Sequence, residues 1–108
     1  MKLPADTIID PRKLTLYLLQ PRAEDDKSHF LAVAGYGMGN AEELLEDIRE
    51  QILPLEAEFL EETEYGPKYQ IRGTLEGPNG NVLRVVTIWI KETATNRTKF
   101  VTLFPDKR

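Results

Sequence analysis

The segment Gly77-Pro78-Asn79-Gly80-Asn81 separates two stretches in which polar and apolar residues alternate. Proline lacks the amide hydrogen that a two-residue loop through Asn79 and Gly80 would need, so the sequence favours a three-residue loop. Pro78 and Asn79 then take the central positions of a type I turn, and Gly80 takes a left-handed bulge position with positive φ. The chain must therefore turn back here as an antiparallel hairpin.

This turn fixes the register between the strands predicted at 68–75 and 82–91. One face pairs Leu75 with Leu83, Ile71 with Thr87 and Tyr69 with Trp89, and the other pairs Thr74 with Arg84, Arg72 with Val86 and Lys68 with Ile90. The stretch 82–91 is apolar on both faces, which is typical of a central strand. Trp89 and Tyr69 then form an aromatic pair that stabilises the sheet, with Trp89 mostly buried. The alternative role for Trp89 is a platform on which a nucleobase stacks.

Two further segments complete the predicted sheet. Residues 55–59 alternate apolar side chains with Glu56 and Glu58, which predicts an edge strand with an acidic outer face that discourages edge pairing. Residues 99–104 form the last strand, which Pro105 ends. The sheet is thus a meander of three or four antiparallel strands.

Helix signals lie in the first half of the chain. Asp10-Pro11 is typical of a helix start and Pro21 ends the run, which predicts a helix over 11–19. The stretch from Asp25-Asp26 to Gly35 is long enough for a buried strand, but its acidic start and the final glycine favour a helix.

The clearest helix is predicted between Asn40 and Pro54. Asn40 and Glu43 have the spacing of a capping box, and Pro54 ends the helix. An apolar stripe recurs at three- and four-residue spacing, formed by Ala41, Leu44, Leu45, Ile48 and Ile52. Two or three helices followed by an antiparallel sheet define an α+β fold, which we expect to form one domain over residues 1–108.

Composition excludes several classes of function. The 108 residues include no cysteine, so a thiolate nucleophile and a sulfur-ligated metal are excluded, and His29 is the only histidine. We therefore expect no metal and no cofactor. No apolar run reaches the length of a membrane span and the N-terminus lacks a signal-peptide pattern, which predicts a soluble, cytoplasmic protein that does not bind membranes.

Charge is distributed unevenly along the chain. The net charge is −4, which argues against a uniformly basic nucleic-acid binder. Residues 24–64 hold thirteen acidic and two basic residues, whereas residues 66–108 hold eight basic and three acidic residues. One end of the molecule could attract anions, although acids on a solvated helix and bases on a sheet edge are the simpler interpretation.

Several side chains are candidates for chemistry. Lys27, Ser28 and His29 form the densest group of nucleophiles and proton carriers, and the alternative is a surface position for Lys27 and His29. The glycines at 35–39 lack the ending of a phosphate loop and read as a connector. Three glutamates at 61–64 lack the donor spacing of a calcium loop and read as a solvated turn.

Alternation places basic side chains on one face of the sheet. Lys68, Arg72 and Arg84 share this face, with Lys99 as a further candidate. An anionic partner would bind there.

The chain resembles a family of small bacterial proteins known as a domain of unknown function. The resemblance rests on Lys2-Leu3-Pro4-Ala5, Lys27 with Phe30-Leu31, Gly35-Tyr36, Tyr65-Gly66 with Tyr69, Gly77-Pro78-Asn79-Gly80, Thr87-Ile88-Trp89-Ile90 and Val101-Thr102-Leu103-Phe104-Pro105. Members are distantly similar to C-terminal modules of polymorphic and contact-dependent toxins, whose architecture resembles ribonucleases of the barnase, colicin and RelE type. Ser28-His29 departs from the Ala-Arg that is usual in the family.

Two functions follow as expectations. The first is a non-enzymatic interaction module, such as one component of a toxin and antitoxin pair or an oligomer, which binds a protein partner through Val86, Ile88 and Ile90. The alternative is a metal-independent, toxin-like ribonuclease. In that enzyme Lys68, Arg72 and Arg84 would bind RNA, Lys27 or His29 would assist proton transfer, and Thr102 and Trp89 would line the cleft.

Overall fold

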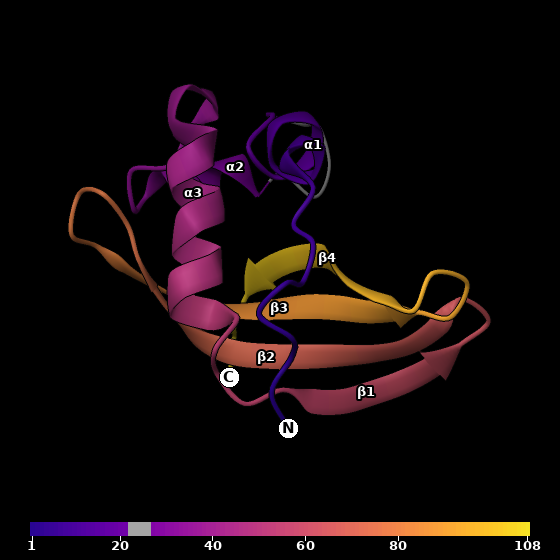
Figure 1. Ribbon diagram of the computed structural model, residues 1–108. Coiled ribbons are helices and arrows are strands. Elements are labelled where there is room, and N and C mark those ends of the chain that lie inside the picture. Colours follow the sequence, from indigo (N-terminus) through magenta and orange to yellow (C-terminus); the bar gives the residue numbers. More distant parts are fainter. Residues whose placement is uncertain (22–26) are drawn as a thin grey trace.

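The computed structural model describes residues 1–21 and 27–108 and shows helices packed on one face of an open sheet (Figure 1). The four strands are β1 (Glu58–Thr63), β2 (Gly66–Glu76), β3 (Val82–Glu92) and β4 (Arg97–Pro105). They pair antiparallel in the order β1-β2-β3-β4. The predicted α+β fold is confirmed, and the meander, predicted with three or four strands, has four.

The helix α1 (Pro11–Lys13) continues as a π-helical stretch over Leu14–Leu18, close to the predicted 11–19. The carboxylate of Asp10 accepts a hydrogen bond of 3.0 Å from the Arg12 amide, as expected of a helix cap. The helix α2 (Ser28–Ala32) confirms helix over strand for the second segment. Its predicted start at Asp25-Asp26 lies outside the described residues.

The helix α3 (Ala41–Asp47) continues as a π-helical stretch over Ile48–Ile52. The predicted capping box is wrong, because the Asn40 side chain points back toward the preceding loop. Its Oδ1 accepts from the Gly37 amide at 2.7 Å and its Nδ2 donates to the Gly35 carbonyl at 3.0 Å. A 3₁₀ turn over Met38–Asn40 precedes α3 and the asparagine closes that turn instead of the helix end.

The hairpin between β2 and β3 has the predicted turn and register. The Gly80 amide donates to the Gly77 carbonyl at 3.0 Å, and Gly80 has φ +88°. All six predicted cross-strand pairs are present, among them Tyr69 with Trp89 and Arg72 with Val86. The missing amide hydrogen of Pro78 thus predicted the register between β2 and β3 correctly.

The predicted first strand at 55–59 begins too early. Leu55 and Ala57 precede β1, and the Ala57 amide donates to the Met1 carbonyl at 2.7 Å instead of pairing within the sheet. The alternating residues 55–59 therefore belong largely to a segment that is hydrogen-bonded to the N-terminus before β1 begins. β1 does form an edge of the sheet, and both Glu58 and Glu61 are exposed.

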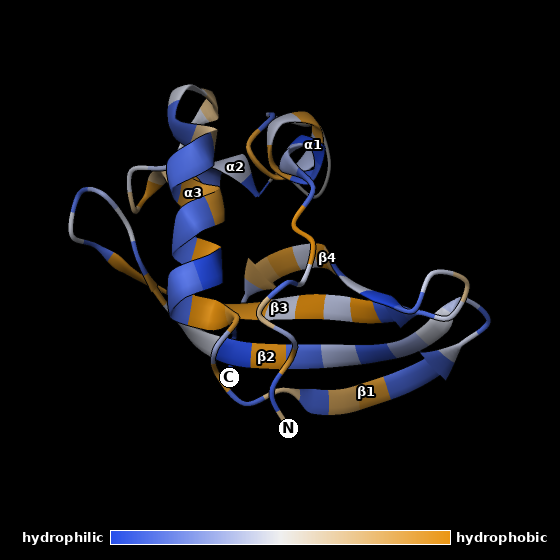
Figure 2. Ribbon diagram, in the orientation of Figure 1, coloured by the Kyte–Doolittle hydropathy of each residue, from blue (hydrophilic) through white to orange (hydrophobic). Residues whose placement is uncertain are grey.

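The core lies between the helices and one face of the sheet. Hydrophobic positions of α3 turn toward α1 and the sheet, and its outward side is hydrophilic (Figure 2). Trp89 is 0% exposed, packs edge-on against Phe100 and donates from Nε1 to the Thr87 hydroxyl at 2.8 Å. Its predicted burial is confirmed. The alternative role of Trp89 as a nucleobase platform is wrong, because helices and strands enclose the ring.

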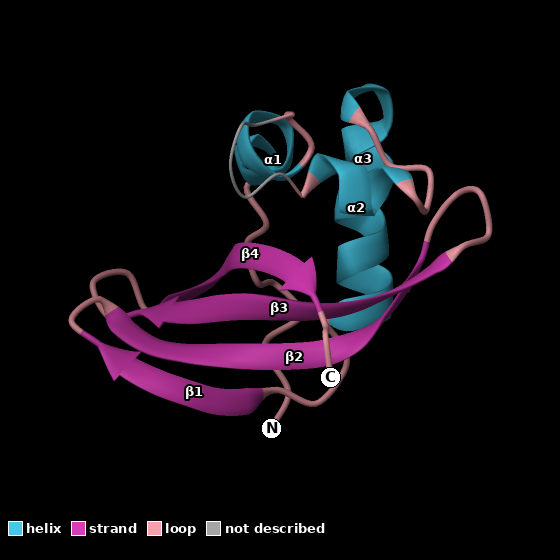
Figure 3. Cartoon of the chain, turned by 180° about the vertical axis from the view of Figure 1, so that it is seen from behind, coloured by secondary structure: helices cyan, strands magenta, loops and turns pink. Residues whose placement is uncertain are grey.

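Among the described residues, no helix lies across the opposite face of the sheet, and the C-terminal segment (residues 106–108) runs over this face from the end of β4 (Figure 3). Val86 and Ile88 lie on this face, 2% and 8% exposed. The expected apolar surface for a partner is therefore largely covered by the chain itself. Among the described residues, no helix is long and apolar enough to cross a membrane.

Candidate functional site

A cleft of about 650 Å³ lies between the C-terminal segment and the N-terminal end of α2. Its lining combines four cations with one acid and four apolar side chains, namely Lys27, Arg72, Lys107, Arg108, Asp106, Phe30, Val86, Phe104 and Pro105. A cleft with a small number of charged groups on an apolar lining is typical of ligand sites.

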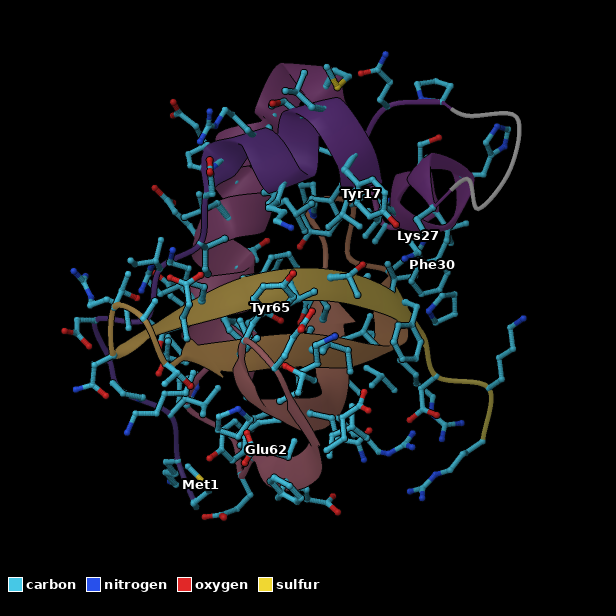
Figure 4. The ribbon with its side chains drawn as sticks, turned by 90° about the vertical axis from the view of Figure 1, so that its right-hand side faces the viewer. Met1, Tyr17, Lys27, Phe30, Glu62 and Tyr65 are labelled. Carbon is cyan, nitrogen blue, oxygen red and sulfur yellow. The ribbon has the colours of Figure 1, made fainter. Side chains whose placement is uncertain are left out.

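Lys27 is the residue before α2, and its side chain lines the cleft. Its Nζ donates to the Thr102 hydroxyl at 3.0 Å and lies 5.3 Å from the centre of the Tyr17 ring and 6.0 Å from that of Phe104. Figure 4 shows Tyr17, Lys27 and Phe30 gathered above β4. Two ring faces and a hydroxyl hold the ammonium group in place while leaving it donors for another acceptor. The structure thus brings together two predicted site residues, Lys27 and Thr102.

Arg72 reaches the cleft because β2 alternation turns it away from the helices. Its Nη1 donates to Asp106 Oδ1 at 3.0 Å, and the two side chains are only 28% and 9% exposed. Arg72 is therefore part of a half-buried ion pair and not a free surface charge.

Asp106 holds the C-terminal segment to the sheet. Its amide donates to the Arg84 carbonyl at 2.9 Å, and its Oδ1 accepts from the Arg108 amide at 3.1 Å. The Arg108 amide and the Arg72 guanidinium hold the pKa of Asp106 below its ordinary value, because both favour the carboxylate. Asp106 therefore carries a negative charge at neutral pH.

The other predicted site residues lie apart. His29 is exposed and lines a separate cavity with Leu19 and Pro21, so the structure does not place it in the cleft with Lys27. Lys68 shares the sheet face of Arg72 but pairs with Ile90 toward the other end of the strands, and the exposed Arg84 meets the C-terminal segment through its backbone.

Sequence reasoning missed the contribution of the C-terminal segment. Asp106, Lys107 and Arg108 follow the last strand with no periodic pattern, so nothing placed them over the sheet. Phe30 was missed because its helix position alone does not tell which element it meets. The adjacent charges after Pro105 were the available signal for a functional segment.

No metal site is evident in the part of the chain that the structure describes, since no three acidic or histidine side chains lie close enough to hold an ion. The nitrogen donors of the cleft suit an anion instead.

The chain belongs to a family described as a domain of unknown function (DUF6883), which it matches over residues 2–107. No curated protein and no solved structure matches it. The expected similarity to toxin modules and to barnase-like ribonucleases stays a prediction.

Proposed function

We propose that the chain is a non-enzymatic interaction module that binds an anionic partner in the basic cleft. One observation carries this proposal: cations from three separate segments converge there, with Lys27 before α2, Arg72 on β2, and Lys107 and Arg108 after β4. Asp106 is the single acid among the described lining residues.

The local charge of the cleft contrasts with the acidic remainder of the molecule. The whole chain has a net charge of −4, and Glu42, Glu43 and Glu46 are exposed on α3. A negative partner is repelled by that surface and attracted to the cleft, so the charge distribution orients the partner as it approaches.

The geometry favours binding over catalysis. A general base must lie within hydrogen-bond reach of the proton it removes, and His29 faces a different cavity. The carboxylate that does lie in the cleft, Asp106, is engaged by Arg72 and has a lowered pKa, which makes it a weak base.

The contact between Lys27 and Thr102 favours a second candidate, the metal-independent ribonuclease. An ammonium group held at 3.0 Å from a hydroxyl could stabilise the charge that develops on a phosphate during attack by a neighbouring 2′-hydroxyl. Arg72 would then hold the phosphate, and His29 would have no part in the reaction.

Fluorescence anisotropy with a labelled oligouridylate and with a labelled polyglutamate peptide tests the main proposal. Lys27→Gln should weaken binding of the preferred probe about tenfold, because a half-buried cation in a cleft contributes more than a surface charge. Lys91→Gln is the matched control, since Lys91 is exposed near the far end of β3 and the charge change is the same.

Absence of binding to both probes would refute the proposal. Electrophoresis of the same oligouridylate after incubation separates the two candidates. Fragments produced by the parent and lost in Lys27→Gln would show the ribonuclease, and intact RNA with the expected loss of affinity supports the binding module.

A further inference from the structure

The Asp106 carboxylate lies in the cleft as an internal anion. Its Oδ1 accepts from the Arg72 guanidinium at 3.0 Å and from the Arg108 amide at 3.1 Å. A guanidinium and a backbone amide directed at one anionic oxygen are also the donors that a bound phosphate oxygen uses.

The surroundings of this oxygen indicate what kind of anion suits the site. Lys27 and Lys107 add positive charge that a single carboxylate does not neutralise. Phe30 and Phe104 line the same cleft, and Phe104 is 36% exposed. Aromatic faces beside cations suit a ligand that joins a phosphate to a flat ring, as a nucleotide does.

We propose that the cleft holds a nucleotide phosphate at Arg72, and that Asp106 occupies this position until the ligand displaces it. This inference rests on the proposed function, since it names the ligand and the regulation of the same cleft. The C-terminal segment acts as a competing internal ligand that lowers the apparent affinity.

The attachments of the C-terminal segment fit a displaceable element. Beyond the end of β4, the ion pair between Asp106 and Arg72 and the hydrogen bond from the Asp106 amide to the Arg84 carbonyl hold it to the sheet. Lys107 and Arg108 are exposed. A segment with two such attachments and two exposed residues at its end can leave the cleft while strands β2 and β3 stay paired, provided that the ligand replaces Asp106 as the anion beside Arg72.

Calorimetric titration with uridine monophosphate, and anisotropy with the labelled oligouridylate, test this inference. Asp106→Asn should tighten binding about tenfold, because apparent affinity rises as the fraction of open cleft rises. Glu64→Gln changes the net charge equally at an exposed turn and should change affinity less than about twofold. Binding of uridine monophosphate indicates a nucleotide site, whereas binding of the oligouridylate without binding of the monophosphate indicates a site that needs the RNA backbone.

A double variant shows whether Asp106 acts through Arg72. In the Arg72→Gln background the gain from Asp106→Asn should vanish, because the two side chains are then no longer coupled. An equal gain in both backgrounds would mean that Asp106 acts only through its charge, and would overturn the inference.

A direct measurement on the parent protein keeps the test independent of these variants. The Asp106 amide, bonded to the Arg84 carbonyl, should lose protection from hydrogen exchange when uridine monophosphate binds. Nucleotide binding with unchanged protection would overturn the displacement while leaving the proposed function intact. Binding of polyglutamate alone would overturn the nucleotide, and binding of no probe at all would refute the proposed function itself.

Discussion

At the scale of single residues, Tyr36 joins three parts of the chain. Its side chain is 2% exposed, its hydroxyl donates to Asp47 Oδ2 at 2.5 Å, and the Glu76 carbonyl lies 3.2 Å away. The hydroxyl thus connects the segment after α2 with α3 and with the end of β2. A buried hydroxyl that bonds a carboxylate contributes more to stability than a neutral pair does.

Tyr36→Phe should lower the free energy of unfolding by about 1.5–3 kcal/mol, because the Asp47 carboxylate loses a donor in a half-buried place. Chemical denaturation measures this as a lower midpoint with an unchanged slope. Tyr65→Phe is the control, since Tyr65 is 67% exposed. Equal midpoints for Tyr36→Phe and the parent would contradict the role of the hydroxyl.

The same contact predicts a dependence on alkaline pH. Burial and the Asp47 carboxylate raise the pKa of Tyr36 far above its ordinary value of 10, because both disfavour the phenolate. A raised folded-state pKa gives stability that is complete below the unfolded-state value and is lost as pH rises above it. The stability difference between the parent and Tyr36→Phe should therefore be constant below pH 10 and shrink above it. Denaturation curves across that pH range test this, and a constant difference would contradict it.

At the scale of elements, the β2–β3 hairpin positions α2 as well as the sheet. The side-chain amides of Asn79 and Asn81 donate to the Val33 carbonyl at 3.0 and 2.7 Å, and the Asn79 amide donates to the Ala34 carbonyl at 3.3 Å. These bonds satisfy carbonyl groups left over at the end of α2. The hairpin thereby fixes the helix whose other end carries Lys27 into the cleft.

Two glycines of this hairpin should respond differently to substitution. Gly77→Ala would bring a Cβ to 2.0 Å from the Ala34 carbonyl oxygen, so either α2 or the hairpin must move. A Cβ at Gly80 has no atom within 4 Å, so Gly80→Val is opposed mainly by φ +88°, which costs about 1–2 kcal/mol. Thermal melting should therefore show a larger loss for Gly77→Ala, together with weaker binding in the cleft. A smaller loss than for Gly80→Val would contradict this contact between the hairpin and α2.

The elements differ in how far their sequence predicts them. The register of β2 and β3 followed from Pro78 and Gly80, because turn geometry is local. The helix 11–19 followed from Asp10 in the same way. The predictions for the start of β1 and for the role of the Asn40 side chain were wrong. Their partners, Met1 and the loop at Gly37, are set by tertiary packing, which the local sequence does not show. The hydrogen bond between Lys27 and Thr102 joins residues 75 positions apart, and no local sequence pattern predicts it.

At the scale of the whole molecule, the two edges of the sheet differ in what covers them. Ile8 bridges β4 from outside, with its amide donating to Thr98 and its carbonyl accepting from Phe100, at 2.9 and 2.8 Å. The opposite edge is β1, where Phe59 and Leu60 are 61% and 41% exposed. An open edge with exposed apolar side chains tends to pair with another copy.

Acidic side chains counter this tendency along β1. Glu58, Glu61 and Glu62 are exposed on the strand, and the register shifts between Phe59 and Glu61, which bends the edge. Two copies brought edge to edge would place these carboxylates against one another. We therefore expect the parent chain to be monomeric when measured by light scattering at low ionic strength.

Neutralising these three glutamates to glutamine should shift the chain toward dimers or larger species, because the repulsion is removed while the apolar side chains remain. The matched control neutralises Glu42, Glu43 and Glu46, which are exposed on α3, and should stay monomeric at the same net charge. Salt near 1 M, where screening acts within about 3 Å, should move the parent in the same direction as the β1 variant. Light scattering over a range of protein concentrations measures the mass. A β1 variant that stays monomeric as the concentration rises would show that the bend alone prevents edge pairing. Equal association of both variants would show that the net charge keeps the copies apart, whatever its position on the molecule.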